Sequence, residues 1–225
     1  MLRAYLLPKG YPESVSPDYL SYQLWDTLQG LMSYLKGVIC TLSFLRGLGV
    51  GSDSTSLEGA MLVWIVRDGT SCVSGLAAGT PALTARFASR ENVRAVRLSA
   101  ETLRGLAGLV ELTASTRGPF LPLVCAAAVC NSFAGVVDSC ARSSLVTHFA
   151  RASNISDCAA KEGNQDRAVK LIGIAVAASF LSSIGNNPRA AWVAYGVLTG
   201  LHLLFNALAM RALRLDDGGA KLRRD

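Results

Sequence analysis

Long uncharged apolar runs dominate the second half of this chain and are the main guide to its fold. Three of them cover residues 118–137, 171–188 and 190–210. A helix that crosses a bilayer needs about 20 predominantly apolar residues. The first and third runs have that length, and the second reaches it when residues 168–170 are included, with Lys170 extending toward the bilayer surface. We expect the last two runs to form a helical hairpin with its turn at 186–189.

The first half of the chain is more interrupted. Residues 1–17 contain Pro8, Gly10, Pro12 and Pro17, which predicts an extended, turn-rich segment. Asp18 is an expected N-cap for a helix that continues to residue 45. Residues 59–79 form a further apolar run of spanning length, interrupted by two adjacent charges at 67 and 68. The polar stretch 138–170 is also predicted to be mostly helical.

Charged residues recur at steps of three or four in a predicted helix over 84–115, so they share one stripe. Val96, Leu106 and Val110 fall on the opposite side. This pattern predicts a surface helix with a buried apolar face and a solvent-facing basic face. The predicted surface basic stripe consists of Arg86, Arg90, Arg94, Arg97 and Arg104, with Glu101 among them.

The composition supports an all-α, membrane-embedded protein. Hydrophobic residues make up 51% of the chain and charged residues 17%, whereas a soluble domain carries about 25% charged residues. We therefore predict a multi-helix bundle with several transmembrane helices and one basic amphipathic surface helix. It is expected to be a single domain over 1–225, ending in a polar tail at 216–225. A soluble bundle with unusually apolar helices is the alternative, and the uncharged run at 190–210 argues against it.

Charge and motif content narrow the function classes. The net charge of +6 comes without an aromatic-interleaved basic platform or zinc-finger spacing, so we expect a lipid bilayer rather than nucleic acid as partner. The six cysteines include no CxxC pair, and only two histidines are present, so no metal site is expected. The recognised nucleophile, metalloprotease and nucleotide-binding motifs are missing from the sequence. We therefore expect neither an enzyme nor a bound cofactor.

Two charges in the middle of an apolar run are the first candidate site. Arg67 and Asp68 would lie near the centre of a spanning helix, where a charge costs several kcal/mol and usually faces the bundle interior. Adjacent helical positions diverge by about 100°, so partners on other helices are needed, with Asp138 and Arg142 as one candidate set. Two interpretations stay open, a substrate or coupling site and a structural network of salt bridges.

A second group of candidates lies in the polar stretch and the last apolar run. An isolated lysine can form a Schiff base with an aldehyde such as pyridoxal phosphate, but no phosphate-binding loop accompanies the lysine here, and solvated helix charges are the favoured interpretation. A histidine inside a spanning segment indicates either a functional group or a hydrogen bond to another helix. These candidates are His148, Asn154, Asp157, Lys161, Gln165, His202 and Asn206.

Several blocks resemble the root UVB sensitive family. The opening LPKGYPESVSPDYL at 7–20, followed by YQLWDTLQ at 22–29, looks like the start of that family's domain. The segment WIVRDG at 64–69 is similar to its W-x-x-R-D-G motif, and the region from His148 to Gln165, with KEG at 161–163, resembles its histidine-to-K-D/E-G-x-Q region. The last similar block contains His202, Asn206, Arg211 and Leu213. Members of the family usually continue well beyond this point.

The resemblance implies a membrane protein linked in plants to UV-B responses in roots, vitamin B6 homeostasis and auxin transport, whose members act in complexes with each other. It implies no known reaction. We therefore expect an intracellular multi-pass membrane protein, in plastids or another endomembrane, with a transport-like or homeostatic role and a small-molecule ligand related to vitamin B6. The alternative is a membrane-anchored scaffold that assembles as a homo- or hetero-oligomer with family members and transports nothing.

Overall fold

The computed structural model describes residues 2–50, 56–184 and 187–215, and this part of the chain is almost wholly helical. No strand forms within it, and a single β-bridge pairs Val15 with Ala150. The all-α prediction is confirmed. The helices are α1 (Leu2–Leu6), α2 (Tyr19–Gly47), α3 (Leu57–Ala78), α4 (Pro81–Phe87), α5 (Val93–Arg117), α6 (Phe120–Phe149), α7 (Ile155–Ile184) and α8 (Pro188–Ala212), with a 3₁₀ turn at Arg90–Asn92 between α4 and α5.

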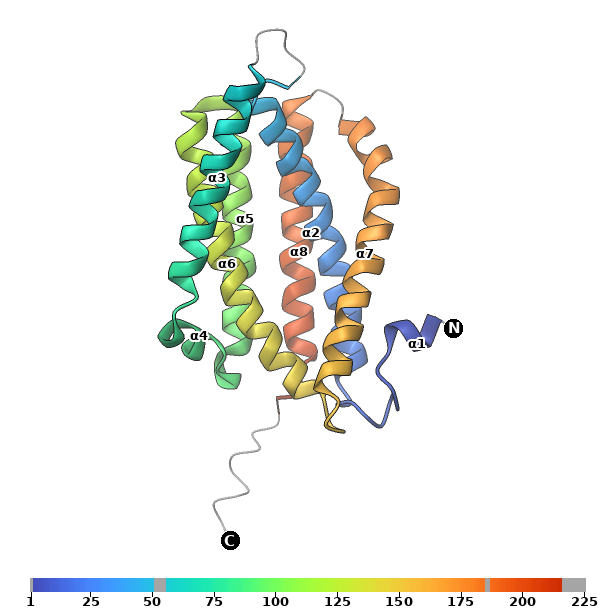
Figure 1. Ribbon diagram of the computed structural model, residues 1–225. Coiled ribbons are helices and arrows are strands. Elements are labelled where there is room, and N and C mark those ends of the chain that lie inside the picture. The colour runs from blue at the N-terminus through green and yellow to red at the C-terminus, as the bar shows by residue number, and fades with distance from the viewer. Residues whose placement is uncertain (1, 51–55, 185–186, 216–225) are drawn as a thin grey trace.

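Six long helices run up and down along one another to form the bundle (Figure 1). Helices α2 and α8 pack side by side at its centre, and α5 contacts both of them. Helix α6 packs along α5, α3 covers the outer side of α6, and α7 lies against α2. The short helices α1 and α4 lie at the same end of the bundle as the start of α2 and the end of α8.

Local sequence signals account for several helix boundaries. The Ser56 hydroxyl accepts a hydrogen bond from the backbone N–H of Gly59 and caps α3. The Asn187 side chain accepts from the N–H groups of Arg189 and Ala190, and Pro188 occupies the first turn of α8, as expected for a hairpin turn. Residues 185–186 of that turn lie outside the described residues.

Two boundary predictions were wrong and a third was correct only in position. The segment 84–115 is not one helix, because α4 ends at Phe87 and α5 begins only at Val93. The segment 1–17 contains a short helix, α1. Asp18 occupies the predicted N-cap position of α2, but its side chain forms no capping hydrogen bond and contacts His148 and Arg214 instead. The three apolar runs form parts of longer helices, because the polar stretch 138–170 continues α6 and begins α7 without a long break.

Four helices, α2, α6, α7 and α8, are long and apolar enough to cross a membrane. The predicted run at 59–79 forms α3, which is not among these four. Large hydrophobic side chains are exposed on the outside of the bundle, including Leu76, Leu171 and Val193. The described part of the bundle therefore carries an apolar outer surface, which a soluble protein normally avoids.

The orientation predicted for the basic stripe is only partly correct: Val96 is buried and Arg94 is exposed as expected, but the middle of α5 is turned the other way. Arg97 is 0% exposed and Glu101 is buried, whereas Leu106 on the supposedly buried side is 54% exposed. Arg104 is half-buried, and only Arg86 and Arg94 are exposed. Of Arg90, only the backbone lies within the described part. The stripe is therefore divided: Arg97 and Glu101 lie in the bundle interior and Arg104 lies partly in it, because ion-pair partners are present there, whereas Arg86 and Arg94 stay exposed.

The contact between α5 and α8 depends on a glycine. A Cβ atom on Gly108 would lie 2.0 Å from the hydroxyl oxygen of Tyr195, a buried side chain that donates a hydrogen bond to the carbonyl of Gly105. In contrast, a Cβ atom on Gly196 or Gly200 would meet nothing within 4 Å. The close approach of these helices is thus set by Gly108 and not by the GxxxG spacing in α8.

We predict that Gly108→Ala lowers the free energy of unfolding by about 1–3 kcal/mol, because the buried Tyr195 ring has to move. The matched control Gly196→Ala is expected to be neutral or stabilising by up to about 1 kcal/mol, because it fills open space on a helix. Thermal unfolding of the two purified variants checks this. Equal melting temperatures would contradict the packing described here.

Candidate functional site

A buried network of charged side chains occupies the middle of the bundle. At its centre the Arg97 guanidinium lies 2.7 Å from Asp26 Oδ1 of α2 and 3.0 Å from Asp138 Oδ1 of α6, and it donates to Gln29 Oε1 at 3.3 Å. All four side chains are buried. An uncompensated charge in such a place is very costly, so each member depends on the others.

Two further arginines, Arg104 and Arg142, extend the network from Asp138. Arg104 pairs with Glu101 of its own helix and lies 3.7 Å from Asp138. Arg142 contacts the same Asp138 at 3.5 Å and reaches Glu162 at 2.9 Å and Asp166 at 3.0 Å on α7. Asp138 is therefore the shared carboxylate that connects α5, α6 and, through Arg142, α7. Asp138 and Arg142, which were predicted as partners of Arg67 and Asp68, instead contact each other within this network.

A histidine from α8 joins the network to the last helix. Nε2 of His202 lies 2.9 Å from a Glu101 carboxylate oxygen, and its Nδ1 lies 3.3 Å from the backbone oxygen of Gln29. The imidazole is fully buried. One turn further along, Asn206 is also fully buried, and neither atom of its amide has a hydrogen-bond partner among the described residues. The interhelical hydrogen bond predicted as one interpretation of His202 is thus formed.

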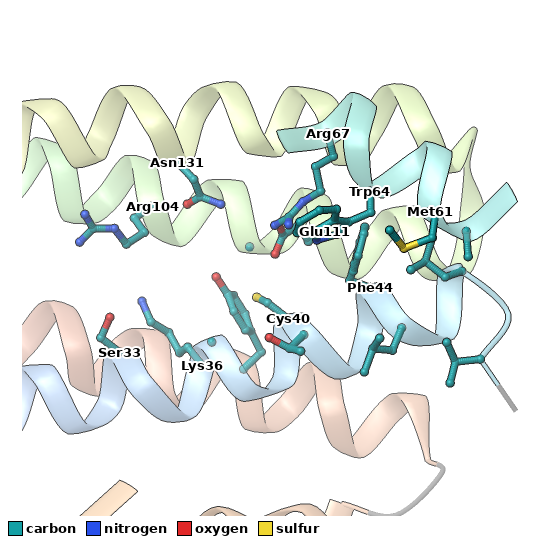
Figure 2. A pocket seen from close by; sticks show the side chains of 18 of the residues that line it. Ser33, Lys36, Cys40, Phe44, Met61, Trp64, Arg67, Arg104, Glu111 and Asn131 are labelled. Atoms are coloured by element: carbon teal, nitrogen blue, oxygen red, sulfur yellow. The ribbon is translucent and has the colours of Figure 1, made fainter. Parts of the chain in front are cut away.

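A cavity of about 790 Å³ opens beside this network, between α2, α3 and α5 (Figure 2). Its inner end carries polar groups from three helices, namely Ser33, Lys36, Arg104 and Asn131. Its outer end is lined by Phe44, Leu48, Met61 and Trp64, with the ion pair of Arg67 and Glu111 beside these side chains. The cavity thus combines a charged end with an aromatic and aliphatic wall.

A second cavity of about 510 Å³ lies on the other side of Arg104. Its lining includes Gln29, Glu101, Asp138, Arg142 and Asp166, all of them members of the charged network. The two cavities share Ser33 and Arg104 as lining residues. Arg104 and Ser33 therefore separate two spaces that follow one another along the interior of the bundle.

Arg67 and Asp68 have different environments. Arg67 points into the first cavity, where it donates to Glu111 Oε1 at 2.9 Å and its guanidinium carbon lies 4.7 Å from the Phe44 ring centre. Asp68 is exposed on the outer side of α3. Arg67 does have a partner on another helix, as predicted, but the partner is Glu111 on α5 and not the predicted set of Asp138 and Arg142 on α6.

The polar residues at the start of α7 hold the N-terminal segment. Lys161 Nζ donates to the carbonyl of Ala4 at 2.6 Å, Gln165 donates to the carbonyl of Leu6 at 2.6 Å, and Asp157 accepts from the N–H of Lys9 at 2.7 Å. The Asn154 side chain accepts from the N–H of Ala152 and so stabilises the turn before α7. These side chains are engaged in contacts with the chain itself, and the amine of Lys161 is not simply solvated.

His148 belongs to the same end of the bundle. Its Nε2 lies 2.9 Å from Asp18 Oδ2, which also accepts a hydrogen bond from the backbone N–H of Arg214. Burial of Asp18 opposes its ionisation, but these hydrogen bonds outweigh it and lower the pKa of the carboxyl group. Asp18 thereby connects the start of α2, the end of α6 and the segment after α8.

Sequence reasoning missed about half of the network. Asp26, Gln29 and Glu162 appeared only within blocks that resemble the family. Lys36, Glu111 and Asp166 were not predicted as site residues. The available signal was the same one that selected Arg67, namely an ionisable residue within a long apolar helix. Within the described residues no group of three or more His, Cys, Asp or Glu side chains could hold a metal ion.

Comparison with known protein families tests the resemblance of the sequence motifs to the root UVB sensitive family. A family profile described as the vitamin B6 photo-protection and homoeostasis domain matches residues 1–217. The chain belongs to the root UVB sensitive family. The matched region contains the whole charged network and both cavities. The resemblance of the motif blocks to this family is therefore confirmed.

Relatives occur in distant organisms. RUS family member 1 of Dictyostelium discoideum is 33% identical over 219 residues, which cover 93% of this chain and 40% of the relative. Protein root UVB sensitive 3 of Arabidopsis thaliana is 34% identical over 220 residues, covering 96% of this chain and 49% of the relative. The chain thus spans less than half the length of these two relatives. No solved structure shows a significant similarity to it.

We predict that Arg97→Leu destabilises this root UVB sensitive domain by about 3–5 kcal/mol, because it leaves Asp26 and Asp138 buried without their shared cation. The matched control Arg86→Leu, at an exposed position of the same predicted stripe, is expected to change stability by about 0.5 kcal/mol or less. Folded yield and thermal unfolding in detergent measure both. Equal tolerance of the two substitutions would contradict a structural role for the network.

Proposed function

We propose that this domain is a membrane-embedded helical bundle that binds a small anionic aromatic molecule of the vitamin B6 class and has a transport-like or homeostatic role. The observation that carries the proposal is the 790 Å³ cavity, which joins a cationic polar end to an apolar aromatic wall inside the bundle. The ligand class comes from the family description, and the chemistry of the cavity is compatible with it.

The distribution of polar and apolar residues supports the membrane location. Four helices have the length and composition to span a bilayer, and the outer surface carries large exposed hydrophobic side chains. The charged residues Arg97, Glu101 and Asp138 are instead turned inward, as is usual for ionisable groups in membrane helices. A bilayer around the bundle would cover the apolar surface that water would otherwise contact.

The size and lining of the cavity support the choice of ligand. Pockets for small organic ligands commonly measure about 300–1,000 Å³ and combine apolar walls with a few polar groups. Lys36, Arg67 and Arg104 line this cavity together with one carboxylate, Glu111, so cationic groups are in excess. A phosphorylated pyridine ring offers an anion for the cationic end and a flat face for the side chains of Phe44 and Trp64.

The second cavity supports a transport-like role over simple storage. It continues from the first cavity at Ser33 and Arg104 toward the side of the bundle where Arg142 and Asp166 lie. A ligand that passes from one space to the other would have to displace the Arg104 side chain. Arg104 is half-buried and pairs with Glu101, so its movement would need an alternative conformation of that ion pair.

The alternative is a scaffold that recruits partners through the basic stripe, and it has fewer exposed arginines available than the sequence predicted. Arg97 is buried and Arg104 faces the interior. Arg86 and Arg94 are exposed, and Arg94 donates to the carbonyl of Leu213 at 2.6 Å. Assembly with family members stays a prediction.

For ligand binding, we predict that the purified domain in detergent binds pyridoxine 5′-phosphate, which has the anion and the ring but no aldehyde. Arg104→Gln is expected to weaken binding by about tenfold or more, because it removes a charged contact worth about 1.5–3 kcal/mol. Arg86→Gln, outside the cavity, should leave the affinity unchanged. Isothermal calorimetry measures both, with melting temperatures as the folding control. Absence of saturable binding to the folded wild-type domain would refute the ligand proposal.

For the membrane location, we predict that the chain stays in the membrane pellet after alkaline carbonate extraction. In a cysteine-free background, Val193→Cys on the outer side of α8 should resist a polar maleimide in membranes and react after denaturation. Glu13→Cys, at an exposed position in the segment before α2, should react with the same maleimide in permeabilised membranes without denaturation. Equal labelling of both positions, together with release into the supernatant, would instead favour a soluble bundle.

A further inference from the structure

One lysine amine in the first cavity is buried and has no partner. The Lys36 side chain is 4% exposed, and its Nζ has no hydrogen-bond partner among residues 2–50, 56–184 and 187–215. Figure 2 shows the side chain extending from α2 across the cavity toward the helices that carry Arg104 and Asn131. A buried polar group without a partner is costly, and such groups are retained mainly where they serve a function.

The other described lysines differ from Lys36 in this respect. Lys161 donates to the Ala4 carbonyl and lies 4.0 Å from Asp157, while Lys9 and Lys170 are exposed. Lys36 also shares its cavity with the guanidinium of Arg104. Desolvation and a neighbouring cation are the two settings in which a lysine becomes a nucleophile toward carbonyl compounds, and Lys36 has both.

We propose that Lys36 captures the aldehyde form of the ligand as a reversible imine, an inference that rests on the proposed function of this cavity. The neutral amine adds to the aldehyde carbon and forms a C–N bond. Both amine hydrogens then leave with the former carbonyl oxygen as one molecule of water, and a C=N bond remains. No oxidant or reductant takes part, and addition of water reverses the step.

The placement of Lys36 determines which molecules the cavity would distinguish. An anionic aromatic aldehyde gains a covalent bond to Lys36 in addition to the contacts of its anion and ring, whereas the corresponding alcohol gains only the contacts. The domain would therefore retain the reactive aldehyde longer than the alcohol. Such retention keeps the aldehyde from reacting with other amines, which is consistent with a homeostatic role.

The test uses the full chain purified in detergent, pyridoxal 5′-phosphate as the probe, and borohydride to reduce any imine to a stable secondary amine. Peptide mapping by mass spectrometry then locates the adduct. We expect Lys36 to be modified at least about tenfold more than Lys9, Lys161 or Lys170, which report the background reaction of free amines. An excess of pyridoxine 5′-phosphate should suppress the adduct at Lys36 and not the background.

Variants separate this inference from the proposed function. Lys36→Met should lose the adduct while Lys161→Met keeps it, and Lys36→Arg provides a variant that retains the positive charge. If pyridoxine 5′-phosphate binds the folded wild-type domain but Lys36 reacts no more than the exposed lysines, the imine is refuted and the ligand proposal stands. If neither probe binds, the proposed function fails and the imine fails with it. The mapping on the wild-type chain gives this result even if Lys36→Met does not fold.

Discussion

The contact of Arg97 with Asp26 and Asp138 is the interaction on which the rest of the bundle depends. These three side chains come from α5, α2 and α6, and all of them are buried. The attraction between buried charges is strong, but the loss of hydration on burial is of similar size. The pairing is therefore better understood as fixing which helices meet, and at what height, than as a large net source of stability. A helix that slid by one turn would leave at least one charge unpaired.

The same network determines how the two cavities are built. Asp138 binds Arg97 on one side and lies close to Arg104 and Arg142 on the other, so it positions the side chains that line both spaces. Glu101 is held between Arg104 and His202, which connects α8 to the wall of the second cavity. Lys36 lies outside these pairs. Each charged side chain of the network forms at least one ion pair, whereas the Lys36 amine forms neither an ion pair nor a hydrogen bond among the described residues. This contrast is what makes Lys36 stand out as a reactive group and not as a further structural charge.

The sequence predicted the helices better than their orientation. Uncharged runs of about 20 residues located α6, α7 and α8 because length and composition are local properties. The need of Arg67 for a partner on another helix was also foreseeable. The identity of that partner, Glu111, was not, because the height at which two helices pack against each other is not encoded in the spacing along either one. Interhelical partners therefore had to come from the structure.

The error about α5 has a physical cause that applies more widely. Periodicity places Arg94, Arg97, Glu101 and Arg104 on one stripe of the helix, but it does not say whether that stripe faces outward. The usual assignment assumes water outside, where charges are stable and apolar groups are not. In a bundle with an apolar outer surface and carboxylates inside, the assignment reverses in the middle of α5, where Leu106 is exposed while Arg97 and Glu101 are enclosed, and only Arg94 near the start of the helix stays exposed. Acidic residues within neighbouring apolar helices, such as Asp26 and Asp138, are the sequence signal for such a reversal, because they need cations inside the bundle. A charged stripe should therefore be assigned to the surface only after the charges on the other helices have been paired.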